Sequence, residues 1–191
     1  VIRAPSDTDS GTILQINTGF VNASSVKTSG LDFGVRYLLE PGDWGTLTPS
    51  LNATYLLDYE LQDPQAGRID GAGQRNFRNF GTSAPELRLN AGLAWQRGLH
   101  TANLYLRHIS SYDDDQPATG PASIDADTRI DLQYAMDISE WLTLANGATL
   151  TLGVRNVTDE APPRVATNGG FDSKVADPRG RLLYLGTQMD F

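Results

Sequence analysis

The sequence contains no cysteine, only two histidines, and no apolar run that approaches the length of a membrane-spanning helix, which needs roughly 18 apolar residues. The absence of cysteine excludes disulfides, zinc–thiolate sites and cysteine nucleophiles. Positive charge is scarce as well, because 15 Lys and Arg stand against 23 Asp and Glu in 191 residues, and the net charge is −8. Nucleic acid is therefore not an expected partner, since its phosphates would be repelled.

What the sequence does contain is a repeated alternation of apolar and polar side chains with the two-residue period of a β-strand. The alternating segments run for 9 to 15 residues in several cases, longer than the usual globular strand of about 5–6 residues. A tilted strand that crosses a membrane needs about 9–11 residues. The pattern predicts an all-β, antiparallel, up-and-down fold of about eight strands, near residues 14–20, 31–39, 47–61, 87–95, 101–108, 129–138, 148–157 and 181–191.

No charged residue occupies the apolar side of these segments, although 20% of the residues are charged. Such exclusion is typical of a lipid-facing surface, where Arg or Lys costs about 2–4 kcal/mol at the midplane. It is equally typical of the inner face of a soluble β-sandwich. The opposite side carries charges of both signs, among them Arg36, Asp58, Glu60, Arg88, Arg107, Arg129, Asp131, Asp137 and Arg155. This side is expected to face water.

The connections between the predicted strands alternate between short and long from residue 39 onward, and the long ones follow Leu61, Tyr112 and Val157. Long loops at one end and turns at the other are the layout of an outer-membrane barrel, whose turns lie in the periplasm. Trp44, Trp95 and Trp141 all lie beside the shorter connections. Because Trp prefers the membrane interface, the pattern favours a transmembrane β-barrel, with Phe191 facing lipid.

The last part of the chain then resembles a known family. "LTLGVRNVTDEAPPRV" (150–165) and "FDSKVADPRGRLLYLGTQMDF" (171–191) are similar to the C-terminal end of the TonB-dependent outer-membrane receptors. "VKTSGLDFGVRY" (26–37) resembles a further strand of the same family through Thr28, Gly30, Leu31 and Asp32. The C-terminal motif is matched by Gly153, Asn156, Asp159, Asp177, Pro178, Gly180, Arg181 and Phe191.

The resemblance implies a 22-stranded barrel in the outer membrane of a Gram-negative bacterium, with an N-terminal plug and energy supplied by the TonB complex. Residues 1–191 would then be the C-terminal strands of that barrel, an open curved sheet with two unpaired edges, with the plug and the earlier strands outside this chain and the C-terminus in the periplasm. The implied function is import of a scarce nutrient, such as a ferric siderophore, cobalamin or an oligosaccharide. The alternatives are a stand-alone eight-stranded outer-membrane barrel, structural or hydrolytic, and a soluble β-sandwich binding module.

Two groups of residues are candidates for specific roles. Ligand recognition is assigned to the long loops, with Arg68, Arg75, Phe77, Arg78 and Phe80 able to stack on a ligand or bind its anionic groups. The terminal strand resembles the signal recognised by the barrel-assembly machinery, through Tyr184, Gly186, Met189 and Phe191.

Other chemistry is weakly indicated. The run Asp113 to Asp115 lacks the spacing of a calcium loop and is interpreted as a solvated acidic tip. A hydrolase site would have to combine His108 with Asp113 or Asp114, and no serine or acidic residue stands at a spacing typical of a triad. The sequence therefore predicts neither an enzyme nor a cofactor, and its expected partners are outer-membrane lipid, the TonB complex, the barrel-assembly machinery and a small-molecule nutrient.

Overall fold

The computed structural model describes most of the chain, namely residues 2–3, 13–16, 25–63, 67–77, 82–115, 122–142 and 147–190. The predictions made for Arg78, Phe80 and Phe191 lie outside these described residues. The helical segments among them are single 3-10 turns, η1 (Gly42–Trp44) and η2 (Ser139–Trp141). None of the described helices is long or apolar enough to cross a membrane.

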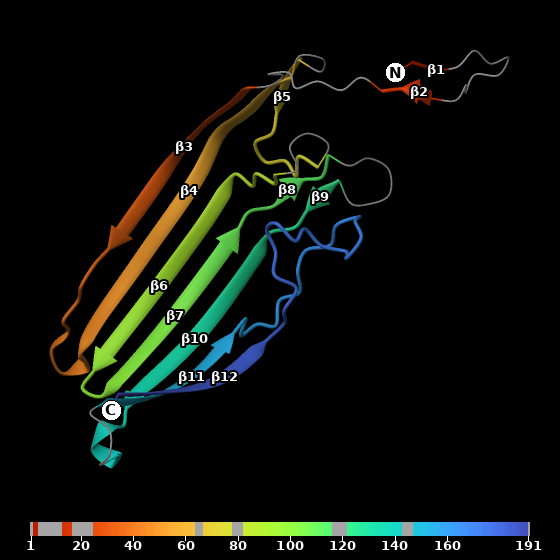
Figure 1. Cartoon of the computed structure of the whole chain (residues 1–191). Helices are drawn as coiled ribbons and strands as arrows, with labels where there is room; N and C mark the ends of the chain where they lie inside the picture. Colours follow the sequence, from red (N-terminus) through yellow and green to blue (C-terminus); the bar gives the residue numbers. More distant parts are fainter. Residues whose placement is uncertain are drawn as a thin grey trace.

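One antiparallel sheet of eight strands forms the body of the protein (Figure 1). Neighbouring strands follow the order β12-β11-β10-β7-β6-β4-β3, and β5 pairs with β4 beside this path. The strands are β3 (Ser25–Arg36), β4 (Thr46–Asp63), β5 (Gly67–Asp70), β6 (Leu87–Arg97), β7 (His100–Ile109), β10 (Asp127–Asp137), β11 (Gly147–Arg155) and β12 (Leu182–Asp190). Seven of the eight predicted strands are confirmed, in the predicted meander.

The first predicted strand, near residues 14–20, is wrong as a member of this sheet. Its described part, β2 (Ile13–Gln15), pairs instead with β1 (Ile2–Arg3) in a separate two-stranded sheet. The eighth strand of the main sheet is β5, which lies within a connection that the sequence predicted as loop. Its four residues pair with the end of β4, and such a short segment carries too little alternation to be recognised.

The apolar side of the sheet is exposed. Leu31 on β3 is 62% exposed and Leu183 on β12 is 73% exposed, and the same side of the strands between them carries exposed Leu93, Leu104, Leu132 and Leu152. No second sheet covers this face within the described residues. The soluble β-sandwich is therefore wrong, because its apolar faces would be buried against each other.

The sheet is open, with β3 and β12 as its two edges. These strands do not pair with each other in the described part of the chain, so a closed eight-stranded barrel is not formed. Long connections lie at one end of the strands and short turns at the other (Figure 1), as the sequence predicted. At the short-turn end Trp44 is 73% and Trp141 67% exposed, and Trp95 Nε1 donates to the Trp44 carbonyl at 2.7 Å.

A β-bulge in β4 changes which side chains share a face near the long-loop end. The register between β3 and β4 shifts by one residue at this point. Gly30 pairs with Leu56, whereas Ser29 pairs with Asp58, so Leu57 is the extra residue. Ser29 lies two residues before Leu31 in an uninterrupted strand, so Asp58 joins the face that carries Leu31. Ser29 Oγ donates to the Asp58 carboxylate at 2.5 Å.

The bulge overturns part of the sequence-based assignment of faces. Asp58 and Glu60 were expected on the polar side, but the extra residue reverses the alternation beyond it. Glu60 forms an ion pair with Arg68 of β5, while Leu61 on the opposite side is only 5% exposed. Paired charges thus end the apolar face of β4 on the side of the long loops.

Candidate functional site

The long connections pack against one another at their end of the sheet. Tyr112 on β8 (Tyr112–Asp113), Ile124 on β9 (Ser123–Ile124) and Val165 form a buried apolar group, with Val175 packed against it. We call the described parts of 71–86, 110–126 and 156–181 the loop cluster. Because the apolar face of the sheet is exposed, the main buried apolar group of the described chain lies in this cluster.

A buried carboxylate joins all three connections of the loop cluster. Asp172, which is 6% exposed, accepts hydrogen bonds from the hydroxyls of Ser83 and Tyr112, the latter at 3.0 Å. Burial, followed by the neighbouring Asp172 carboxylate, raises the pKa of Tyr112 well above its ordinary value. The phenol is therefore kept protonated as the donor to Asp172.

A buried ion pair adds a second link between two of the connections. Arg75 Nη1 lies 3.1 Å from Asp114 Oδ1, and the two side chains are only 6% and 1% exposed. The Arg75 guanidinium also lies 4.7 Å from the centre of the Phe77 ring, and the Phe77 N–H donates to Asp115 Oδ1 at 2.8 Å. The run of aspartates is therefore not a solvated tip, because two of its members bind the neighbouring loop.

The three described recognition candidates do not lie in one group. Arg68 lies on β5 and pairs with Glu60, whereas Arg75 is buried against Asp114 and Phe77. Of the three described candidates only Arg68 and Phe77 are exposed, and Phe77 is 50% exposed. It borders a cavity of about 170 Å³ in the loop cluster, which is lined also by Arg75, Ser83, Phe171, Asp172 and Lys174.

Several residues of the C-terminal motif meet in one junction between β11 and β12. Asn156 and Asp159 both have positive φ, at 53° and 58°, which Asn and Asp tolerate better than most residues. The buried Asn156 side chain donates to the Glu160 carbonyl and accepts from the Glu160 N–H, both at 2.9 Å. Asp159 Oδ1 accepts from the Arg181 N–H at 2.7 Å, so the turn after β11 holds the start of β12.

Close approach explains the two glycines of this motif. A Cβ on Gly153 would lie 2.1 Å from Tyr184 Cζ, and a Cβ on Gly180 would lie 2.8 Å from Asp159 Oδ1. Asp177 forms an ion pair with Arg179 at 2.6 Å, and this bond lowers the pKa of the Asp177 carboxyl. These contacts give the motif residues a structural part in joining the last two strands.

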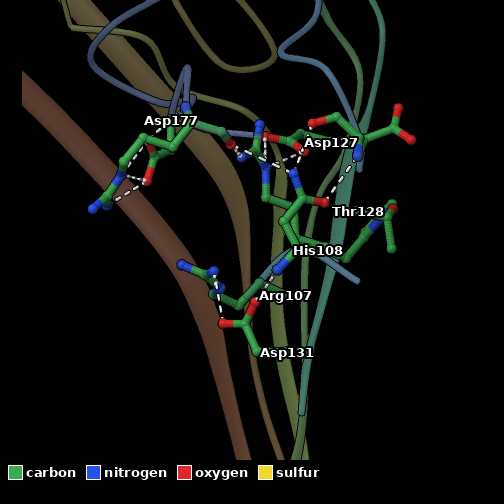
Figure 2. Close-up of polar contacts among 10 residues, drawn as sticks. Arg107, His108, Asp127, Thr128, Asp131 and Asp177 are labelled. Carbon is green, nitrogen blue, oxygen red and sulfur yellow. Dashed lines mark hydrogen bonds and ion pairs between the residues drawn. The ribbon is translucent and has the colours of Figure 1, made fainter. Parts of the chain in front are cut away.

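The polar face of the sheet carries a cross-strand ion pair between Arg107 and Asp131, which Figure 2 shows. Their nitrogen and oxygen atoms lie 3.0 Å apart, and Asp131 also accepts from the Asn156 N–H at 2.8 Å. His108 instead bonds to Thr128 at 2.7 Å (Figure 2). The hydrolase pairing of His108 with Asp113 or Asp114 is thus not formed, and no cluster of potential metal ligands occurs among the described residues.

The terminal strand β12 is an edge strand, with Leu183 and Leu185 exposed on the apolar face. Tyr184 turns to the polar face, where it packs against Gly153 and lies 5.9 Å from the Arg155 guanidinium. Gly186 pairs with Thr151, and Met189 pairs with Ala148. The recognition role suggested for these residues stays a prediction.

Asp172 and Ser83 were not predicted from the sequence, in which they lie 89 residues apart. The only sequence property that points to a role for them is their position in the long connections, and many other polar residues share that position. Asp172 also belongs to the segment that carried the family resemblance, but the resemblance gave it no role.

The chain matches a protein family described as TonB dependent receptor-like, beta-barrel, over residues 2–157. This range includes every strand of the main sheet from β3 to β11. It ends before the return segment of the C-terminal junction, so the roles of Asp177, Gly180 and Arg181 rest on the contacts described above. No curated protein and no solved structure matches the chain.

Proposed function

The chain belongs to the TonB-dependent receptor-like β-barrel family, whose role is TonB-dependent transport at the outer membrane, and from this premise we propose that the protein imports a scarce nutrient. The observation that carries the proposal is a single sheet with one exposed apolar face and one polar face. Such a wall separates lipid from an aqueous lumen. Ferric siderophores, cobalamin and oligosaccharides are the proposed substrate classes.

Residues 1–191 form, in this proposal, the C-terminal part of a wider 22-stranded barrel that also encloses a plug. The open edges at β3 and β12 support it, because in a bilayer the unpaired N–H and C=O groups of an edge must find a partner. An eight-stranded barrel is filled by its own side chains, so a transport lumen requires additional strands.

The orientation follows the usual arrangement of such barrels. The short turns, with the exposed Trp44 and Trp141, would lie at the periplasmic interface. The strand β12 runs toward this end of the sheet (Figure 1), so the C-terminus would be periplasmic. Its outward Leu183 and Leu185 and its unpaired edge fit recognition by the barrel-assembly machinery, and energy would arrive from the TonB complex.

The loop cluster is the proposed site of ligand recognition. It is held rigid by Asp172 and by the Arg75–Asp114 pair, and rigid loops lose less entropy on binding. Phe77 and Lys174, at the cavity of about 170 Å³, are the proposed contacts by stacking and charge. Arg75 would act through its packing under Phe77, since its guanidinium is already paired with Asp114.

Uptake measurements test this function directly. A strain that lacks the gene is expected to lose TonB-dependent uptake of one labelled nutrient among a ferric siderophore, cobalamin and a maltodextrin. Phe77→Ala is expected to weaken ligand binding about tenfold, whereas Phe33→Ala, on the exposed apolar face, serves as the control. Unchanged uptake of every nutrient in the deletion strain would overturn the proposed import.

A further inference from the structure

A second cavity lies on the polar face of the sheet and outside the loop cluster's apolar group. Its volume is about 370 Å³, and it is bounded by β6, β7, β10, β11 and the segment that returns to β12. Its charged lining consists of Arg107, Arg129, Arg155, Arg179, Asp131 and Asp177. Four positive charges against two negative ones stand out in a chain whose net charge is −8.

One of the four arginines has no carboxylate partner among the described residues. Three of them each have a carboxylate partner, in the pairs Arg107–Asp131, Arg129–Asp127 and Arg179–Asp177. Arg155 forms no ion pair with any described residue, and its guanidinium lies 5.9 Å from the centre of the Tyr184 ring. Among the described residues, Arg155 is thus the arginine of this cavity whose positive charge has no carboxylate partner.

Arg129 also lines this cavity and has one donor without a partner among the described residues. Its side chain is only 6% exposed, and it donates through Nε to Asp127 at 2.9 Å and through Nη1 to the Arg179 carbonyl at 3.2 Å. Its Nη2 is buried and has no hydrogen-bond partner among the described residues. Since a buried N–H without an acceptor is unfavourable, this side of the guanidinium is suited to an additional oxygen acceptor.

We propose that this cavity binds the oxyanion group of a small organic ligand, a carboxylate or a phosphate, through Arg155 and Arg129. A guanidinium matches the paired oxygens of either group, and charge-assisted bonds of this kind are strong. Ala91, Leu106 and Leu182 line the rest of the cavity and provide apolar contacts for the body of the ligand. The site lies between the polar face of the sheet and the segment that returns to β12, and it shares no lining residue with the cavity at Phe77.

The test measures binding to the full receptor, purified from outer membranes in a nonionic detergent at low ionic strength. Benzoate is the carboxylate probe, inorganic phosphate is the phosphate probe, and benzamide is the neutral analogue of benzoate. Isothermal titration calorimetry is expected to show saturable binding of benzoate, of phosphate or of both, and none of benzamide. Added salt is expected to weaken the binding, because the attraction is electrostatic.

Variants of Arg155 decide whether the site is the one described. Arg155→Gln is expected to raise the dissociation constant at least about tenfold, and Arg155→Lys, which keeps the charge but loses the fork, to raise it less. Arg97→Gln is the matched control, because Arg97 is an exposed arginine at the short-turn end of β6 and lies outside the cavity.

Three results would overturn the proposal: no saturable binding of either anion below about 10 mM, equal affinity in Arg155→Gln, or benzamide binding as tightly as benzoate. Binding of one anion alone supports the site and identifies its chemistry as carboxylate or phosphate. None of these measurements involves uptake, so a failure here leaves the proposed import untouched.

Discussion

Replacing Asp172 by alanine is expected to loosen the three long connections while the sheet stays intact. Its buried carboxylate accepts hydrogen bonds from Ser83 and Tyr112, which belong to the two other connections. It also accepts from the Lys174 N–H at 3.1 Å within its own loop. Alanine removes all three acceptor contacts and leaves the two hydroxyls in a buried position.

The magnitude follows from the number and kind of bonds lost. A hydrogen bond to a charged acceptor contributes about 1.5–3 kcal/mol, so losing both hydroxyl bonds costs about 3–6 kcal/mol of local stability. At 1.4 kcal/mol for each factor of ten, the open form of the loop cluster becomes about 10² to 10⁴ times more populated. Tyr112→Phe and Ser83→Ala each remove one bond, and their effects need not add, because the two donors share one oxygen.

Hydrogen exchange followed by mass spectrometry on the receptor measures this opening segment by segment. Peptides that cover 71–77, 82–86 and 110–115 are expected to exchange faster in Asp172→Ala, whereas those from β6 and β11 keep their rates. Tyr37→Phe is the control, because Tyr37 is 62% exposed. Unchanged loop peptides would refute the reasoning, and so would an equal acceleration throughout the sheet.

Three further predictions concern other parts of the molecule. Folding raises the pKa of Tyr112, so the stabilisation from its neutral phenol is complete below the ordinary pKa of about 10 and is lost as the pH rises above that value. Tyrosinate absorbance should therefore show a late-titrating step that Tyr112→Phe removes. An identical step in the variant would contradict the assignment. Leu185→Arg, near the middle of β12 on the apolar face, should lower the free energy of unfolding in lipid by about 2–4 kcal/mol in urea titrations. Gln188→Arg on the polar face should change it little, and equal losses would mean that the faces are misassigned. Asn156→Ala removes both hydrogen bonds to the Glu160 backbone and should lower the free energy of unfolding by about 2–4 kcal/mol. The folded band in gels should then be lost at a lower temperature. An unchanged temperature would mean that Asn156 does not stabilise the junction.

The alternation of apolar and polar side chains was sufficient to predict most of the sheet. A strand with one face toward an apolar medium needs apolar side chains on that face along its whole length. Strands β6, β7, β10, β11 and β12 lie within two residues of their predicted bounds. The pattern failed at Asp58 and Glu60, where the bulge reverses the faces. A bulge depends on the register with the neighbouring strand, and the sequence of β4 alone contains no mark of that register.

Less of the candidate site than of the sheet could be predicted from the sequence. The sequence predicts that the long connections bind the ligand. It also predicts solvated aspartates near residue 114, but Asp114 is buried against Arg75. The two residues are 39 positions apart. Whether a charged residue in a loop is solvated or paired depends on which other loop lies beside it, and residue type alone does not determine that.

By itself, the sequence determined the class of this protein: the two-residue period, the absence of charge on one side and the alternating loop lengths together require a sheet with one apolar and one polar face. Each of these properties is local, because neighbouring residues in a strand always point to opposite faces. Only the tertiary structure decided that the apolar face is exposed, that the sheet is open at β3 and β12, and that Asp172, Arg75 and Arg129 are buried. Those properties depend on which distant segments come into contact, and contacts between distant segments are set by the folded chain as a whole.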